Sequence, residues 1–251
     1  MRDKIYFITD AHLGNDADSR VREKELCALI DTMRTDARMV VLLGDMFDFW
    51  FSYRYVVPRG MVRLLGRLAQ LADDGVELHF FIGNHDMWLF DYLSSEMNVV
   101  MHEEPTVLEY DGKRFLMGHG DGLGNVDRHY DRLKRVFRSR LNQRLLALLP
   151  TRLTFMVANS WSKSSRSSHG EEDSLYRGDE CEGIVIYCKQ RLMEEKVDFC
   201  VFGHRHMPMV RTIAAENGNS AVYVNVGDWL VHRNYAVYSP EEGMRLEDLS
   251  R

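Results

Sequence analysis

Five short apolar runs in this chain are each followed directly by residues that can bind a metal ion. The runs cover residues 5–8, 39–43, 78–82, 115–117 and 199–202. Each is as long as a strand and apolar on both faces, which is typical of a buried strand in an α/β sheet. The segments that follow them read DAH at 10–12, GD at 44–45, GNHD at 83–86, GHGD at 118–121 and GHRH at 203–206. Because the carboxyl ends of strands in α/β folds meet at one crevice, we expect these side chains to lie close together.

The order of apolar runs and helical stretches predicts the fold class. Amphipathic stretches at about 20–37 and 60–74 separate the first three runs, a β-α-β-α-β order that predicts parallel strands covered by helices. Asp111-Gly112 and Asn217-Gly218 each stand between two strand-like runs and predict hairpins, so antiparallel strands are expected as well. We therefore predict an α/β sandwich of two mixed sheets. The length of 251 residues fits a single domain, 1–251.

The side chains after the five strands suit a pair of metal ions. Seven of them are candidate ligands: Asp10, His12, Asp45, Asn84, His119, His204 and His206. Seven ligands are too many for one tetrahedral ion. We assign Asp10, His12, Asp45 and His206 to a first ion, and Asp45, Asn84, His119 and His204 to a second, so that Asp45 is shared. Oxygen and imidazole ligands without thiolate favour Mn²⁺, Fe²⁺ or Zn²⁺. Two adjacent dications attract phosphate and can stabilise a displacement at phosphorus.

A single Asp or His after a strand would carry little weight. An Asp at that position is most often a helix cap, and an isolated His is most often a core or surface side chain. Five such motifs in succession are hard to explain by chance. His85, which belongs to the third motif, is left over from this ligand assignment.

Residues 128–170 differ from the rest of the chain. They contain ten Lys and Arg and one acid, although the whole chain has a net charge of −6. Apolar residues recur at helical spacing, and Pro150 should divide the segment into two helices. We interpret the segment as an inserted helical cap that is both apolar and basic. It would either bind an anionic membrane surface or simply pack on the core with its arginines in solvent.

Composition excludes several classes of protein. The negative net charge argues against general nucleic-acid binding, so no nucleic-acid partner is expected. No apolar run approaches the ~20 residues that span a bilayer. The first residues, MRDKIYFITD, resemble a core strand rather than a secretory signal. The four cysteines form no C-x-x-C pair, and we interpret them as reduced core thiols of a cytoplasmic protein.

The five motifs, which span nearly the whole chain, resemble those of the calcineurin-like metallophosphoesterases. The resemblance implies a four-layer αββα sandwich and a dinuclear centre that often contains Mn²⁺. It also implies hydrolysis of phosphomonoesters, phosphodiesters or pyrophosphates by a hydroxide that bridges the two metals.

Within that family the chain is most similar to the branch that acts on UDP-2,3-diacylglucosamine in lipid A biosynthesis. The similarity rests on GDMFDFWF at 44–51, on a GHGD motif that leads into a helical insertion, and on total length. It implies cleavage to UMP and 2,3-diacylglucosamine 1-phosphate. It also implies a peripheral location on the cytoplasmic face of the inner membrane of a Gram-negative bacterium, with the cap holding the acyl chains.

The resemblance also implies individual roles. Substrate contacts are implied for Asn84, His85, Asp127, Ser165 and His204. The best-known members of the branch have arginine where this chain has His85, which would act as a general acid or as a donor that stabilises charge on phosphorus. Two other hypotheses remain. One is the same chemistry on a nucleotide phosphodiester or a phosphoprotein, and the other is a non-catalytic scaffold, which the complete ligand set disfavours.

Overall fold

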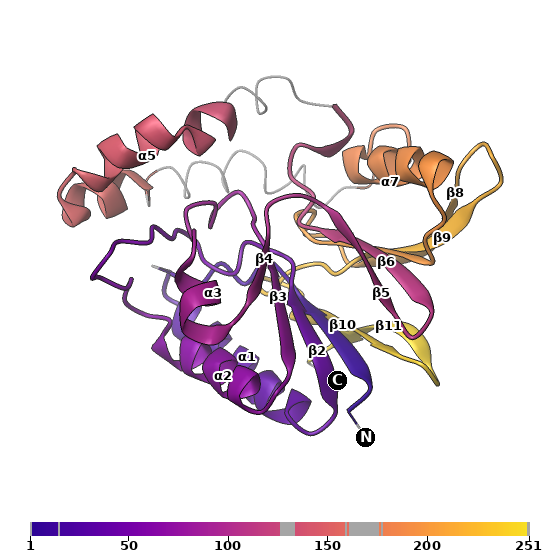
Figure 1. The fold of residues 1–251 in the computed structure, drawn as a ribbon, viewed down its shortest axis with the longest axis horizontal. Coiled ribbons are helices and arrows are strands. Elements are labelled where there is room, and N and C mark those ends of the chain that lie inside the picture. The colour runs from indigo at the N-terminus through magenta and orange to yellow at the C-terminus, as the bar shows by residue number, and fades with distance from the viewer. Residues whose placement is uncertain are drawn as a thin grey trace.

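Two mixed β-sheets pack face to face in the computed structural model, which describes residues 2–14, 16–125, 134–158, 160, 176 and 178–249 (Figure 1). The first sheet has the strand order β11-β10-β1-β2-β3-β4, and the second has the order β5-β6-β7-β9-β8. The first comprises β1 (Lys4–Ile8), β2 (Ala37–Leu42), β3 (Glu77–Phe81), β4 (Val100–His102), β10 (Asn234–Ser239) and β11 (Gly243–Asp248). The second comprises β5 (Thr106–Tyr110), β6 (Lys113–Gly118), β7 (Phe199–Phe202), β8 (Met209–Ala214) and β9 (Ser220–Asn225).

Helices cover the outer faces of both sheets. Those that belong to the first sheet are α1 (Ser19–Met33), α2 (Val62–Asp73) and α3 (Tyr92–Met97), and α7 (Gly183–Glu194) lies on the second. A 3₁₀ turn, η1 (Leu123–Asn125), follows β6, and α5 (Arg140–Ala147) lies across the end of the molecule where β1, β2 and β3 terminate (Figure 1).

The pairing of the strands confirms the predicted mixture. β1, β2, β3 and β4 are parallel to one another, as are β6, β7 and β9, whereas β10 runs antiparallel to β1. The hairpin predicted at Asp111-Gly112 joins β5 to β6, and both turn residues have positive φ (51° and 68°), as a type I′ turn requires. The second predicted hairpin, at Asn217-Gly218, joins β8 to β9.

Three apolar layers hold the sandwich together. The first lies between the first sheet and its helices and contains Leu26, Leu68 and Phe80. The second lies between the two sheets and contains residues such as Phe115. The third lies under α7 and contains residues such as Phe202. These layers separate helix, sheet, sheet and helix, so the expected αββα architecture is confirmed.

Helices also fill much of the described part of segment 128–170. Residues 134–138, α5 and residues 151–158 are helical, and Pro150 stands at the break that was predicted for it. The Trp88 indole N–H donates to the Phe137 carbonyl at 3.0 Å, and the rings of Phe49 and Phe155 lie 5.1 Å apart, so these helices contact the core. Leu141 and Leu145 of α5 are exposed, and Leu145 is 55% accessible. The limits of the cap and the single-domain assignment remain predictions.

Several elements differ from the sequence-based expectation. The first helix ends at Met33 rather than near residue 37, because Ala37 already belongs to β2. β11 was not predicted, because it is a short edge strand of partly buried residues whose alternation is limited to Met244 and Leu246 on the core side. α7 was missed because it begins with the β-branched run of residues 184–186, which a strand could equally contain.

Candidate metal centre

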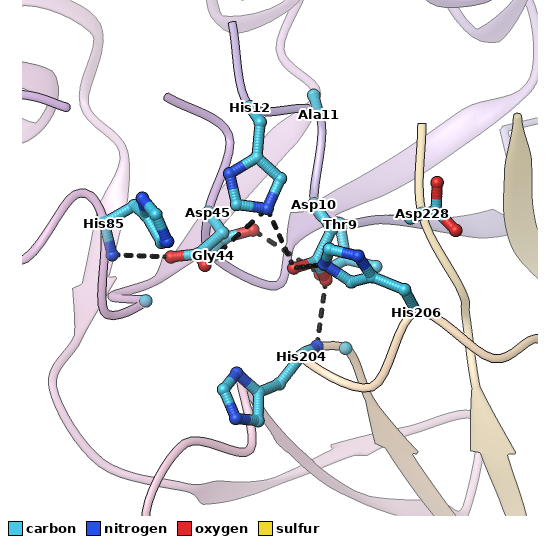
Figure 2. A network of polar contacts seen from close by, with 12 residues as sticks. Thr9, Asp10, Ala11, His12, Gly44, Asp45, His85, His204, His206 and Asp228 are labelled. Atoms are coloured by element: carbon cyan, nitrogen blue, oxygen red, sulfur yellow. Dashed lines mark hydrogen bonds and ion pairs between the residues drawn. The ribbon is translucent and has the colours of Figure 1, made fainter. Parts of the chain in front are cut away.

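The predicted ligands converge at the carboxyl ends of parallel strands from both sheets. Asp10 and His12 follow β1, Asp45 follows β2, Asn84 and His85 follow β3, His119 follows β6, and His204 and His206 follow β7. Figure 2 shows six of these side chains gathered at one point: Asp10, His12, Asp45, His85, His204 and His206. The two sheets therefore each contribute one side of the same crevice.

Asp10 lies between two histidines at distances that suit a shared ion. Its Oδ1 atom is 3.2 Å from His206 Nε2 and 3.5 Å from His12 Nε2. Two ligand atoms that each bind one ion at ~2.1 Å lie roughly 3.0–3.5 Å apart. Asp10, His12 and His206 are accordingly one of the groups of side chains that could hold a metal ion. They are three of the four ligands that the sequence assigned to the first ion.

Asp45 connects this group to the second one. Its Oδ2 atom lies 3.9 Å from His12 Nε2 and 3.4 Å from His119 Nε2. The other two candidate metal-binding groups, His12–Asp45–His85 and Asp10–Asp45–His119, both contain it. One carboxylate oxygen therefore faces histidines of both predicted ion sites, as a bridging ligand would.

His119 is oriented for metal binding by the backbone. Its Nδ1–H donates to the Leu43 carbonyl at 2.8 Å, which leaves Nε2 as the ligand atom. That Nε2 lies 3.2 Å from Asn84 Oδ1. The His204 ring is 5.0 Å from the His119 ring, and its backbone N–H donates to Asp10 Oδ2 at 2.9 Å. Within the described residues, His204 is the one predicted histidine ligand outside the three candidate groups.

The surroundings of His12 fit a bound cation. Its side chain is 2% exposed, and neither ring nitrogen has a hydrogen-bond partner among the described residues. Leaving a buried polar group unsatisfied costs on the order of 1–3 kcal/mol. A cation at Nε2 would remove this cost for that nitrogen, and the oxygen and imidazole atoms around it are ligands that Mn²⁺, Fe²⁺ and Zn²⁺ accept.

Backbone strain is concentrated at the same residues. Asp10, His12, Asp45 and His204 have φ values of 50°, 43°, 51° and 65°, and they are half of the eight described non-glycine residues with positive φ. This left-handed region is unfavourable for residues with a Cβ and persists where the surrounding structure imposes it. The left-handed backbone conformation directs the side chains that follow β1, β2 and β7 toward one another.

Glycines leave the space that these side chains occupy. A Cβ on Gly83 would lie 2.2 Å from Asp45 Oδ1, and a Cβ on Gly203 would lie 2.7 Å from Asp10 Oδ2. Both glycines are the first residue of a predicted motif. Their role is to let the backbone approach the two carboxylates closely.

The electrostatics of the centre favour charged side chains despite complete burial. Burial alone would raise the pKa of Asp45, but His119 and His85 lower it well below its usual range, and His12 and His206 do the same for Asp10. Burial alone would lower the pKa of His12 and His119, but the neighbouring carboxylates raise each to about 10. Without metal ions, these two histidines are therefore protonated at neutral pH and offset the buried negative charge.

Other residues of the site were not identified from the sequence. The Thr9 hydroxyl donates to Asp10 Oδ2 at 2.6 Å, and the Trp229 backbone N–H donates to the Asp10 carbonyl at 3.0 Å. Asp228 is fully buried and accepts hydrogen bonds from Val231 N–H (2.6 Å) and His232 Nδ1 (2.5 Å). Asp228 could have been predicted from the sequence, because Gly227-Asp228 follows a strand in the same way as Gly44-Asp45. The predicted substrate contacts Asp127 and Ser165 lie outside the described residues.

Comparison with known proteins places this arrangement in a family. The model of the calcineurin-like phosphoesterases matches residues 3–208. The chain belongs to this family. A UDP-2,3-diacylglucosamine hydrolase of Porphyromonas gingivalis is 40% identical to it over 252 residues, or 95% of each chain. A protein of the same name from Photobacterium profundum is 29% identical over 96% of this chain and 95% of the relative. This calcineurin-like phosphoesterase is a metal-dependent hydrolase.

Replacing Gly83 with alanine should damage the metal centre. The added Cβ would displace Asp45, so we expect metal affinity to fall roughly ten- to hundredfold, with a loss of ~1–3 kcal/mol in the free energy of unfolding. Gly66→Ala is the matched control, because a Cβ there meets nothing within 4 Å and the residue lies in α2. It should keep the metal and gain ~0.5–1 kcal/mol in stability. Equal metal content of the two purified variants would contradict the account of Gly83.

Metal binding should release protons. Because the pKa of both His12 and His119 is raised to about 10 in the metal-free protein, each loses a proton when it becomes a ligand at neutral pH. The apparent affinity for Mn²⁺ should therefore rise with pH from about pH 6 to about pH 9. Titration calorimetry in buffers with different ionisation enthalpies measures the release directly. An affinity that stays constant with pH, without proton release, would show that these histidines are not ligands.

Proposed function

We propose that this protein hydrolyses the pyrophosphate bond of UDP-2,3-diacylglucosamine to give UMP and 2,3-diacylglucosamine 1-phosphate. The observation that supports the proposal is that side chains able to hold metal ions gather at the strand ends. They occur in a chain that is similar, over 95% of its length, to a relative named for this substrate. The alternative of a non-catalytic scaffold would predict missing ligands, and none of the seven is missing.

The seven ligands are proposed to hold two divalent ions, with Mn²⁺ as the first choice and Fe²⁺ or Zn²⁺ as alternatives. Asp10, His12 and His206 would bind one ion, Asn84, His119 and His204 would bind the other, and Asp45 would bind both. When bound, such ions lower the pKa of coordinated water and neutralise charge that develops on the phosphate.

His85 is the proposed catalytic residue. Its Nδ1 lies 3.0 Å from the Asp48 carbonyl, which can only accept, so Nδ1 carries a proton. A second proton, on Nε2, is then present only when the ring is charged. Burial lowers the pKa of His85 in the empty site. The negative charge of a bound diphosphate would favour the charged ring, which could then donate to the phosphate or to the leaving oxygen.

An open groove beside the centre is large enough to hold part of a substrate. It has a volume of about 490 Å³ and lies next to Asp121, which follows His119 in the fourth motif. Three basic side chains line it, those of Lys134, Arg135 and Arg138, together with two acids. Lys134 pairs with Asp121 at 2.7 Å and Arg138 pairs with Glu104, so the described lining carries a small excess of positive charge. We propose that the diphosphate lies between this groove and the metals and contacts Asn84, His85 and His204. Asp127 and Ser165 are proposed as further contacts.

A peripheral location at the cytoplasmic face of the inner membrane is also proposed. No helix among the described residues is both long and apolar enough to cross a bilayer. α5 instead exposes Leu141, Leu145 and the basic Arg140 and Arg144, a composition that suits the surface of an anionic membrane. The same helices would shield the acyl chains of the substrate from water.

A second candidate substrate class remains. His85 stands where the best-known enzymes of the resembled branch have arginine, and this difference favours another phosphoester, such as a nucleotide phosphodiester or a phosphoprotein. Both substrate classes would be hydrolysed at the same metal centre, but only the UDP-linked lipid would need the cap to hold its acyl chains.

The purified protein with Mn²⁺ should release UMP from UDP-2,3-diacylglucosamine dispersed in detergent, and EDTA should abolish the release. A chromogenic phosphodiester serves as a second substrate that does not need the cap. Hydrolysis of the phosphodiester without any UMP release would reject the proposed substrate while retaining the metallophosphoesterase chemistry.

Two variants separate the roles within the same assay. Asp45→Asn should lose both metal and activity, whereas His85→Gln should keep both metal ions and lose roughly 10²–10⁴-fold in kcat, the usual contribution of a proton donor. Glu241→Gln, at an exposed turn far along the chain, is the control and should match the unmodified protein. Full UMP release by His85→Gln would remove His85 from the mechanism.

A further inference from the structure

The loop between β2 and α2 carries an unusual exposed surface. Residues 54–57 are four consecutive exposed residues, Arg-Tyr-Val-Val, and the side chain of Tyr55 is 83% accessible. Val62, at the start of α2, is 72% accessible. Runs of exposed apolar residues are rare on soluble proteins unless they bind something.

The loop that carries these exposed residues is fixed to the rest of the protein at both ends. Phe51 and Met61, on either side of it, are 3% and 2% exposed, and Pro58 within it is buried. Ser52 donates its backbone N–H to the Trp88 carbonyl at 3.0 Å and its hydroxyl to the Leu89 carbonyl at 2.5 Å. The fold thus holds both ends of the loop and presents its apolar middle to solvent.

The charge around the loop has a single sign. No Asp or Glu occurs from residue 49 to residue 72, whereas four arginines do. Arg63 and Arg67 pair with acids of α1, but Arg54 and Arg59 form no ion pair with any described residue. The Arg54 guanidinium lies 5.1 Å from the centre of the Tyr55 ring. Apolar side chains, a tyrosine and unpaired arginines are the composition that binds the interface of an anionic bilayer.

The loop is continuous with the exposed helices of residues 134–158. A chain of ring contacts links them: Tyr53 to Phe51 at 4.7 Å, Phe51 to Trp88 at 5.9 Å, and Trp88 to Phe137 at 5.5 Å. Twelve of the twenty exposed large apolar side chains of the described residues lie in 55–62 or 136–157. Figure 1 shows α5 and the loop that leads into α2 on the same side of the molecule.

We propose that residues 54–62 form a second membrane anchor, which binds anionic phospholipid together with the exposed helices of 134–158. The inference rests on the proposed function, because a substrate with two acyl chains is presented by a membrane. A bilayer is favoured over a second copy of this chain, since two copies of the same basic surface would repel each other. Docking through both surfaces would turn the groove beside the metal centre toward the lipid.

Binding to vesicles tests the anchor. The variants are Tyr55→Ser/Val56→Ser/Val57→Ser, which keeps the charge, and Arg54→Glu/Arg59→Glu, which keeps the apolar residues. Each should bind vesicles of phosphatidylethanolamine and phosphatidylglycerol about tenfold more weakly or worse in a sedimentation assay. Val210→Ser, an exposed apolar residue on β8 (47%), is the matched control and should bind like the unmodified protein. Vesicles of phosphatidylcholine alone should bind little of any variant.

Three results would overturn the proposal. They are unchanged vesicle binding by both loop variants, equal binding of the unmodified protein to both kinds of vesicle, and a dimer that the serine variant converts to a monomer in light scattering. The assay of UMP release tests the proposed function separately from the anchor, because detergent-dispersed substrate does not need vesicles. The loop variants should retain UMP release and their metal content even where they bind vesicles weakly.

Discussion

The burial of two carboxylates next to each other is the constraint on which this structure depends. Asp10 and Asp45 are 0% and 2% exposed, and they belong to one group of ligand atoms that all lie within 4.8 Å of one another. Two negative charges at this separation, away from water, are stable only if positive charge lies beside them. Protonated His12 and His119 can supply that charge in the empty site, and two dications would supply more of it.

The arrangement of strands in the two sheets makes it possible to bury Asp10 and Asp45 together. Parallel strands of both sheets end at the same crevice, so residues far apart in the chain meet there, and the hydrogen bond from the His204 N–H to Asp10 spans 194 positions. The cost is backbone strain at the ligands and close approach at Gly83 and Gly203. The three apolar layers of the sandwich hold these strained turns in place.

Much of this site could be predicted because the ligands stand directly after buried strands, where local sequence and tertiary position coincide. The structure brings five of the predicted residues, Asp10, His12, Asp45, His119 and His206, into groups that could hold a metal ion, and Asp45 belongs to two of these groups. Their roles as ligands remain predictions. Thr9 and Trp229 could not be found in this way, since their contacts with Asp10 depend on loop geometry. β11 was not predicted because only Met244 and Leu246 mark its core side, too short a pattern to identify a strand. α7 was not predicted because a helix that starts with β-branched residues can be mistaken for a strand.

The two exposed surfaces show a similar contrast. The basic character of 128–170 was evident from composition, whereas the loop at 54–57 emerged only when exposure was known, because three apolar residues in a row also occur in any buried strand. If both surfaces bind a membrane, the metal centre lies beside the lipid from which its substrate would come, and the enzyme would not need to extract that lipid fully into water.

The proposed chemistry depends on a pair of adjacent cations in the crevice. The most direct measurement is anomalous diffraction from crystals of the protein grown with Mn²⁺. Two peaks are predicted, one among Asp10, His12 and His206 and one beside Asn84 and His119, with Asp45 in contact with both. A map with no peak at Asp45, or with a single ion that leaves His119 unbound, would contradict the account.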